Sequence, residues 1–212
     1  MPGAAPKKKK LGLLIGLISG GVVVLGGLIA VLLIFVLPSG KISESDLVSE
    51  TIDETTILRP KQWESVTVNY VSGYGDKKGK DGTSTAAIYV KKQDYVQSGV
   101  KDATSSQLET FRDTVISGMS TSDASSVAKE AGECTSVENV KITKSDVEKS
   151  NSIGILRIDA TCKRDSGAFT LALYLALGDD GYLRSVFLMS TENLWKQNSA
   201  VFDKMLESVD QA

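Results

Sequence analysis

The segment FTLALYLAL, residues 169–177, carries apolar side chains at positions that would point to both faces of a β-strand. A strand with one face in water alternates apolar and polar residues, whereas a strand covered on both faces reads as a nearly continuous apolar run. The segment therefore predicts a central strand in a sheet that other elements cover on both sides.

The neighbouring segments predict the rest of a β-meander. Residues 137–144 form one expected strand, and residues 153–163 form the next, with a shared face made by Leu156, Ile158, Ala160 and Cys162. Asp179-Asp180-Gly181 has the composition of a hairpin turn, after which residues 182–189 return as a strand. Two carboxylates without further ligands at alternate positions do not make a calcium loop, so turn chemistry explains them.

Further segments place strands and helices around this meander. Residues 55–59, 64–71 and 85–90 have β character, and residues 73–82 read as a loop. Helical spacing of apolar residues predicts a helix near residues 106–120. A second helix, capped by Ser190 or Thr191, carries on one stripe Leu194, Val201, Phe202, Met205 and Val209. These elements predict an α+β domain built on an antiparallel sheet that helices flank.

Residues 11–37 form an apolar segment in which Ser19 is the only polar side chain. A helix of this length would be about 40 Å long, which exceeds the ~30 Å hydrocarbon core of a membrane. Secretory signals have an apolar region of only about 7–15 residues and end at an A-x-A-like site, and no such pattern precedes Pro38-Ser39-Gly40. The segment favours a retained transmembrane helix, with a cleaved signal as the alternative.

The charges beside this segment predict its direction. Residues 1–10 form a basic tail that ends in Lys7–Lys10, and no acidic residue occurs before Glu44. Because short cationic flanks stay in the cytoplasm, we expect a single-pass protein of the cell membrane whose C-terminal part is extracytoplasmic. The polar and acidic residues 38–54 are expected to form a linker, and residues 55–212 to form one folded domain.

Gly12, Gly16 and Gly20 are spaced four residues apart within the apolar segment. Small residues at this spacing let two membrane helices approach closely, as in G-x-x-x-G dimers. Glycine is common in membrane helices in any case. The strip therefore indicates either a homodimer through this helix or glycine that faces lipid and ordinary packing.

Composition excludes several classes of function. All 26 acidic residues and all but four of the 24 basic residues follow residue 37, so the exported part is mildly acidic and nucleic acid is not an expected partner. The chain has no histidine, which removes Ser-His-Asp and Cys-His catalysis and histidine-ligated zinc. Lysine, carboxylate and tyrosine chemistry remain, but no catalytic, metal or cofactor motif is recognisable.

Cys134 and Cys162 are the two cysteines of the chain, and they do not form a C-x-x-C pair. Such spacing fits neither a thioredoxin-like motif nor a zinc knuckle. In an exported domain two lone cysteines most simply form a disulfide. The alternative is a pair of buried thiols that behave as small apolar side chains.

Two further features have both a structural and a functional interpretation. Lys77, Lys78 and Lys80 cluster in residues 73–82, which form either a hairpin loop or a basic surface for an anionic partner. A phosphate-binding loop is excluded because Tyr74 stands where that motif requires glycine. Trp63 and Trp195 lie at element boundaries, where large aromatic side chains close a core more often than they form a binding platform.

The segment Ile57–Trp63, ILRPKQW, is similar to the strand–Pro–x–Gly–Trp entry of Mog1/PsbP-like domains, although Gln62 stands where glycine is usual. Phe187–Met189, followed by Glu192, Trp195 and residues 201–206, resembles the last strand and C-terminal helix of that family. The resemblance covers about residues 55–209. It implies an α/β/α sandwich around an antiparallel sheet and brings no enzyme with it. The metal-binding histidines of the plant photosystem subunit have no counterpart here.

These observations lead to one expected function and two alternatives. We expect a membrane-tethered, extracytoplasmic and non-catalytic binding or accessory domain, a subunit or interaction module of an envelope complex whose protein partner the sequence does not identify. One alternative is an oligomer scaffold that acts through the transmembrane helix. The other is an enzyme that uses carboxylates or lysine.

Overall fold

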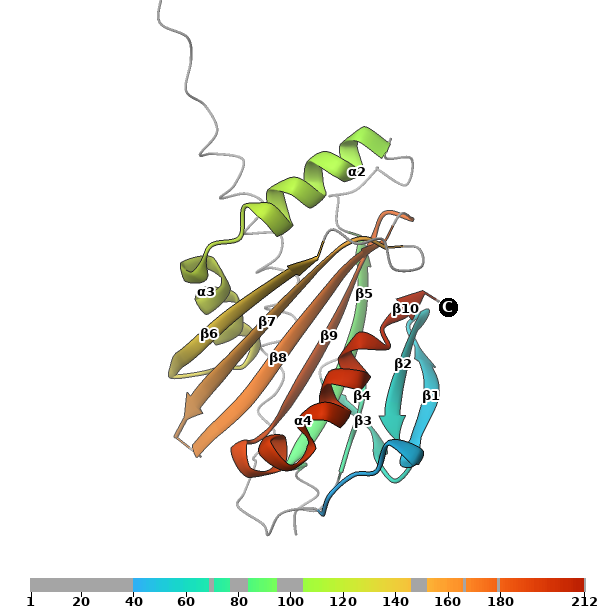
Figure 1. Cartoon of the computed structure of the whole chain (residues 1–212), viewed down its shortest axis with the longest axis vertical. Helices are drawn as coiled ribbons and strands as arrows, with labels where there is room; N and C mark the ends of the chain where they lie inside the picture. Colours follow the sequence, from blue (N-terminus) through green and yellow to red (C-terminus); the bar gives the residue numbers. More distant parts are fainter. Residues whose placement is uncertain are drawn as a thin grey trace, which may run out of the picture.

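A seven-stranded antiparallel sheet forms the centre of the molecule, and helices lie on both of its faces (Figure 1). The computed structural model describes residues 40–68, 71–76, 84–94, 105–145, 152–165, 167–178 and 180–211. The predicted tail, transmembrane helix and Gly12, Gly16 and Gly20 lie outside these residues. Within the described ranges, no helix has both the length and the apolar character needed to cross a membrane.

The sheet has the strand order β3-β4-β5-β9-β8-β7-β6, and each neighbouring pair is antiparallel. The strands run along the chain as β3 (Glu64–Val68), β4 (Val71–Gly75), β5 (Ala86–Asp94), β6 (Ser136–Ser145), β7 (Ser152–Arg164), β8 (Gly167–Gly178) and β9 (Tyr182–Thr191). The meander predicted from residue 137 onward is confirmed. The segment 64–71 is two strands, because the chain reverses after Val68.

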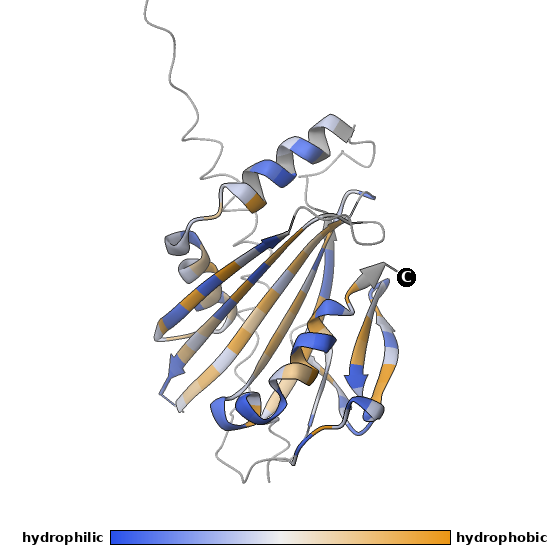
Figure 2. Cartoon of the chain, viewed as in Figure 1, coloured by the Kyte–Doolittle hydropathy of each residue, from blue (hydrophilic) through white to orange (hydrophobic). Residues whose placement is uncertain are grey.

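Strand β8 is buried on both faces, as its apolar run predicts, and every residue from Leu171 to Gly178 is buried. Leu171 and Leu173 belong to the apolar cluster on one face of the sheet, whereas Ala172 and Tyr174 belong to the cluster on the other. Strands β6 and β7 alternate hydrophilic and hydrophobic residues instead (Figure 2). Strand β8 therefore contributes side chains to both apolar layers, one on each face of the sheet.

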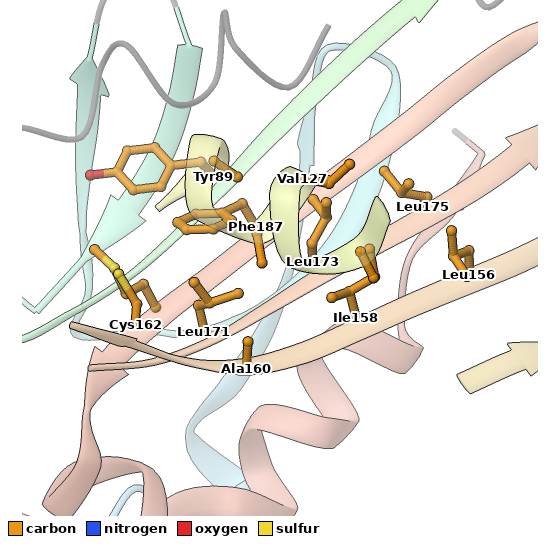
Figure 3. Packing of buried hydrophobic residues seen from close by; sticks show 14 of the residues in the cluster. Tyr89, Val127, Leu156, Ile158, Ala160, Cys162, Leu171, Leu173, Leu175 and Phe187 are labelled. Atoms are coloured by element: carbon orange, nitrogen blue, oxygen red, sulfur yellow. The ribbon is translucent and has the colours of Figure 1, made fainter. Parts of the chain in front are cut away.

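Helices α2 (Ser105–Arg112) and α3 (Thr121–Ala131), joined by the π-helical turn η2 (Asp113–Ser117), lie on one face. Val127 of α3 packs with side chains from β7, β8 and β9 (Figure 3). The single helix expected near residues 106–120 therefore ends early, and α3 was not expected. Ser120 begins α3 through a capping box with Asp123, and the buried side of α3 is mostly small, namely Ala124, Val127, Ala128 and Ala131.

Helix α4 (Glu192–Glu207) and a small sheet of β1 (Leu47–Ile52), β2 (Thr55–Pro60) and β10 (Asp210–Gln211) cover the opposite face. The predicted stripe of α4 is largely confirmed, because its buried side includes Leu194, Val201, Phe202 and Met205. Asn198 is also buried, and its side-chain oxygen accepts a hydrogen bond from the Ile42 amide at 2.6 Å. The N-terminal end of the described chain is thus attached to α4.

The expectation that residues 38–54 form a polar linker is wrong for most of that segment. Residues 44–46 form the short helix η1, and β1 pairs with β2 along its whole length. The hairpin turn uses Asp53 and Glu54, whose φ angles of 50° and 54° suit the tight turn that joins two twisted strands. The folded domain therefore includes residues from Ile42 onward, because β2 supplies the pairing partner that the sequence of β1 does not reveal.

The expected loop over residues 73–82 also begins too early, because β4 extends to Gly75. A side chain at Gly73 would collide with the carbonyl oxygen of Ile88 on the neighbouring strand. Glycine at this position reflects close packing within the sheet as well as turn character. Lys77, Lys78 and Lys80 lie outside the described residues.

Cys134 and Cys162 form the predicted disulfide, with their Cα atoms 5.4 Å apart. The bond joins the segment that follows α3 to β7, and both cysteines are buried. Next to it, Nε of Arg164 donates a hydrogen bond to the Gly132 carbonyl oxygen at 2.7 Å, at the C-terminal end of α3. Covalent and polar contacts therefore hold α3 against the sheet.

We predict that reduction of this disulfide lowers the free energy of unfolding by about 3–4 kcal/mol, because the loop that it closes is free in the unfolded, reduced chain. Chemical denaturation of the full chain in detergent micelles, with and without a thiol reductant, measures this difference. The Cys134→Ala, Cys162→Ala double variant serves as the control and should not respond to reductant. Equal denaturation midpoints for the oxidised and reduced protein would refute the prediction.

Candidate functional site

The two covering layers are offset across the sheet. Helix α3 packs on β6 and β7, whereas α4 packs on β8, β9 and β2. On the α4 side this offset leaves a groove of about 360 Å³ between α4 and the outer face of β6, β7 and β8. This volume lies within the range of small-ligand sites. The groove is the candidate functional site.

Strand register explains why polar side chains converge in this groove. Lys141 and Thr143 of β6 lie opposite Asp159 and Arg157 of β7, and Arg157 lies opposite Tyr174 of β8. Residues directly opposite each other in an antiparallel pair share one face of the sheet. Helix α4 adds the facing wall, to which it contributes Asp203 and Glu207.

Arg157 is fixed by two carboxylates. Its Nε donates to both oxygens of Asp159 at 2.9 Å, and its Nη2 donates to Asp159 at 2.7 Å and to Asp203 at 2.6 Å. Burial alone would lower the pKa of Arg157, but the hydrogen bonds that it donates to Asp159 and Asp203 outweigh burial and raise the pKa above its usual value. The guanidinium therefore joins β7 to α4 and holds the groove in one shape.

Tyr174 lines the groove although only 4% of its surface is exposed. Its hydroxyl forms no hydrogen bond with any residue that the structure describes. Burial raises the pKa of Tyr174 to about 12, nearby Glu207 adds to the increase, and Arg157 opposes it. The hydroxyl is neutral at physiological pH, as is any tyrosine with a pKa of about 10 or more, and it can donate a hydrogen bond to a ligand.

Two charged side chains of the groove, and one nitrogen of a third, have no partner in the described part of the chain. Lys141 and Glu207 are exposed and form no ion pair there, and Nη1 of Arg157 donates no hydrogen bond there. Lys141 comes from β6 and Glu207 comes from α4, so they lie on opposite walls. The groove therefore offers a cation at one side and an anion at the other.

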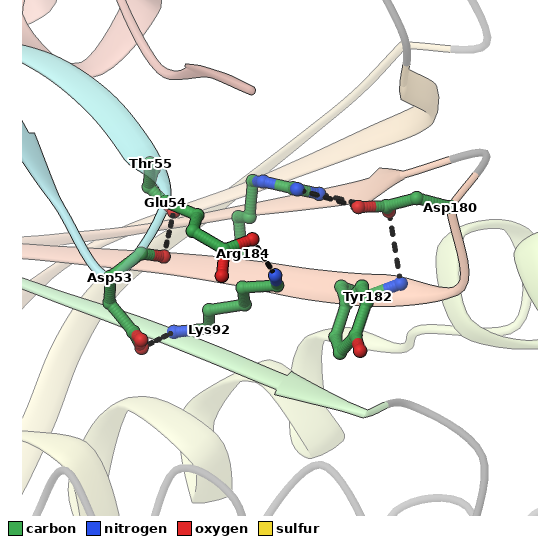
Figure 4. A network of polar contacts seen from close by, with 7 residues as sticks. All are labelled: Asp53, Glu54, Thr55, Lys92, Asp180, Tyr182 and Arg184. Carbon is green, nitrogen blue, oxygen red and sulfur yellow. Dashed lines mark hydrogen bonds and ion pairs between the residues drawn. The ribbon is translucent and has the colours of Figure 1, made fainter. Parts of the chain in front are cut away.

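A second polar network lies where the β1–β2 turn meets the central sheet (Figure 4). The amide of Lys92 donates to Asp53 at 2.8 Å, and the Lys92 ammonium pairs with Glu54. The same ammonium lies 3.9 Å from the centre of the Tyr182 ring. Because its charges are paired within the protein, we interpret this network as a brace between β1–β2 and β5.

The predicted turn after β8 contributes to the same region. Asp180 accepts a hydrogen bond from the Tyr182 amide at 3.2 Å and pairs with Arg184 at 2.7 Å. Burial opposes ionisation of Asp180, but these bonds outweigh it and lower the pKa of the carboxyl group. Asp179 lies outside the described residues. Among the described residues, no group of three or more histidine, cysteine, aspartate or glutamate side chains could hold a metal ion.

Trp63 packs in the core beneath α4, and Trp195 belongs to α4 itself and packs against the edge of that core. Trp63 is 3% exposed, and its ring centre lies 6.3 Å from that of Phe202. The ring of Trp195 lies 5.2 Å from the same phenylalanine and is partly buried. The packing interpretation of both tryptophans is confirmed.

Sequence reasoning missed the groove residues Arg157, Asp159 and Asp203. The sequence did contain a signal for two of them. Arg157 and Asp159 are charged residues at alternate positions of β7, the strand next to the apolar β8. A charged pair at alternate positions of an inner strand indicates a face that its covering layer does not reach. No sequence pattern showed that Asp203 of α4 would meet this pair.

We predict that Tyr174 ionises near pH 12 in the native protein. A folded-state pKa above the usual value near 10 means that burial of the neutral phenol stabilises the fold fully below pH 10 and that this stability is lost as the pH rises toward 12. The ultraviolet absorbance of tyrosinate is recorded just after a pH jump in wild type and in Tyr174→Phe. The difference between the two absorbances reports the ionisation of Tyr174. If this absorbance difference rises with a midpoint near pH 10, the buried position of Tyr174 is contradicted.

No protein-family model and no curated protein sequence matches the chain. Among solved structures, the chain is similar to CyanoP, the cyanobacterial PsbP from Synechocystis sp. PCC 6803, with a TM-score of 0.49, 14% identity, and coverage of 84% of this chain and 99% of that chain. It is also similar to LpqN, involved in cell envelope biogenesis of Mycobacterium tuberculosis, with a TM-score of 0.42, 10% identity, and coverage of 82% and 98%. PA94 from Pseudomonas aeruginosa, a protein of unknown function, matches with a TM-score of 0.40, 12% identity, and coverage of 78% and 97%. CyanoP is a PsbP protein, the kind that the sequence resembles, and a likeness to a solved structure does not bring a function with it.

Proposed function

We propose that this chain is a membrane-tethered, extracytoplasmic and non-catalytic binding domain that recognises its ligand or partner in the groove between α4 and strands β6–β8. It serves as an interaction module of an envelope complex. The observation that carries this proposal is the fixed position of Arg157, which two carboxylates from different elements hold in the groove.

The disulfide between Cys134 and Cys162 supports the location. Such bonds form and persist in oxidising compartments and are rare in the cytosol. The basic tail and the apolar residues 11–37 supply a matching anchor with the same sidedness. A tethered domain would present its groove outside the cytoplasmic membrane.

Preformed polar geometry favours binding. A site whose side chains are already ordered loses less conformational entropy when its ligand arrives. Arg157 is ordered by its contacts with Asp159 and Asp203, and the side chain of Tyr174 is almost wholly buried. The groove therefore needs little rearrangement to receive a ligand.

The same contacts argue against the enzyme alternative. Asp159 and Asp203 both accept hydrogen bonds from Arg157, so each is already engaged in an ion pair. Tyr174 is a poor general base, because burial raises its pKa to about 12 and a catalytic base works best when its pKa lies near the operating pH. The converging groups are arranged for recognition.

A photo-crosslinking amino acid placed at Thr143 tests the proposal, because the Thr143 side chain is exposed and lines the groove. The matched control carries the same amino acid at Lys129, which is exposed on α3 on the other face of the sheet. With the full chain in its own membranes, we expect a discrete crosslinked product from Thr143 and none from Lys129.

Both variants must first retain the thermal transition of the wild-type protein. The Arg157→Gln change should then remove the Thr143 product, because Asp203 and Asp159 lose the group that orders the groove. Identical products from Thr143 and Lys129, or no product from Thr143, would show that the groove is not the binding site.

A further inference from the structure

On the basis of the proposed function, we propose that the groove binds a small zwitterion of about dipeptide size. Its carboxylate would meet Lys141, its ammonium group would meet Glu207 and Asp203, and its central carbonyl oxygen would meet Tyr174 and Nη1 of Arg157. The inference names the ligand class of the groove and goes beyond the statement that the groove binds.

The separation of the unpaired charges fits such a ligand. Lys141 lies on β6, and the opposite wall is α4, which packs on β8 and β9 and reaches Arg157 of β7 through Asp203 at 2.6 Å. Neighbouring strands are about 4.8 Å apart, so two strand spacings amount to about 10 Å. An extended dipeptide spans about 7 Å, and the flexible side chains of Lys141 and Glu207 cover the remainder.

The floor of the groove offers hydrogen-bond donors. Tyr174 lines the groove, and its hydroxyl carries a proton at physiological pH that it can donate. Nη1 of Arg157 carries two further N–H groups that no described residue accepts. Donors at the centre of a groove favour a ligand with an acceptor oxygen between its two charged ends, and the carbonyl of a peptide bond is such an oxygen.

Ligands with one kind of charge, or none, fit less well. A simple anion would approach Lys141 but also meet Asp203 and Glu207, whereas a simple cation would leave Lys141 unpaired beside it. An apolar ligand would remove these charges from water without replacing their hydrogen bonds, which is unfavourable. A ligand with both charges satisfies both walls.

Titration calorimetry of the full chain in detergent micelles tests this inference with L-alanyl-L-alanine as the probe. The comparison arms are its N-acetylated form and its C-terminal amide, which remove one charge each. We expect the free dipeptide to bind and each blocked form to bind at least about tenfold more weakly, since each loses an ion pair and a charge-assisted hydrogen bond.

Matched variants assign each end of the ligand. Lys141→Gln should weaken binding of the free dipeptide about tenfold and leave the affinity for the C-terminal amide unchanged. Glu207→Gln should likewise weaken binding of the free dipeptide about tenfold and leave the affinity for the N-acetylated form unchanged. Lys129→Gln is the control and should change nothing. All three side chains are solvent-exposed, and a retained thermal transition verifies that each variant is folded.

Two outcomes overturn the inference. One is equal binding of the free and blocked dipeptides, and the other is absence of binding by the free dipeptide. If a crosslink specific to Thr143 persists in either case, the groove remains a binding site and only the ligand class is wrong. If that crosslink is also absent, the proposed function fails as well.

Discussion

The burial of β8 on both faces is the constraint on which the rest of the structure depends. Leu171 and Leu173 need one apolar layer, and Ala172 and Tyr174 need another. A single sheet cannot supply either, so the chain provides α3 on one side and α4 with the β1–β2–β10 sheet on the other. The disulfide and the hydrogen bond from Arg164 hold the first layer in place, and Trp63 and the α4 residue Trp195 pack against Phe202 in the second.

The groove is a consequence of this double covering. Each layer is narrower than the seven-stranded sheet, and the two are offset, so β6 and β7 are covered by α3 but not by α4. The outer face of β7 carries Arg157 and Asp159 where a covered strand would carry apolar side chains. The contact of Arg157 with Asp203 offsets the desolvation of a half-buried guanidinium and fixes the position of α4 at the rim. Stability and the binding geometry thus share one ion-pair network.

Much of the fold could be predicted from local pattern, because alternation and continuous apolar runs report how many faces of a strand are covered. The meander from β6 to β9, helix α4 and the disulfide follow from such patterns. Strand β1 could not be predicted, since its pairing with β2 is a tertiary contact that its own polar sequence does not show. Helix α3 was missed because alanines form its buried side. The groove was missed for a related reason: Asp203 joins Arg157 only after α4 has packed on the sheet.

Hydrogen–deuterium exchange of the full chain in detergent micelles tests the central role of β8 most directly. Amides of a strand buried on both faces at the centre of a sheet exchange only when the whole domain unfolds. We therefore predict that Leu171–Leu177 exchange more slowly than the edge strand β6 and at the rate of global unfolding. Exchange of Leu171–Leu177 as fast as that of β6 would contradict the account, because the sheet would then lack one of its two covering layers.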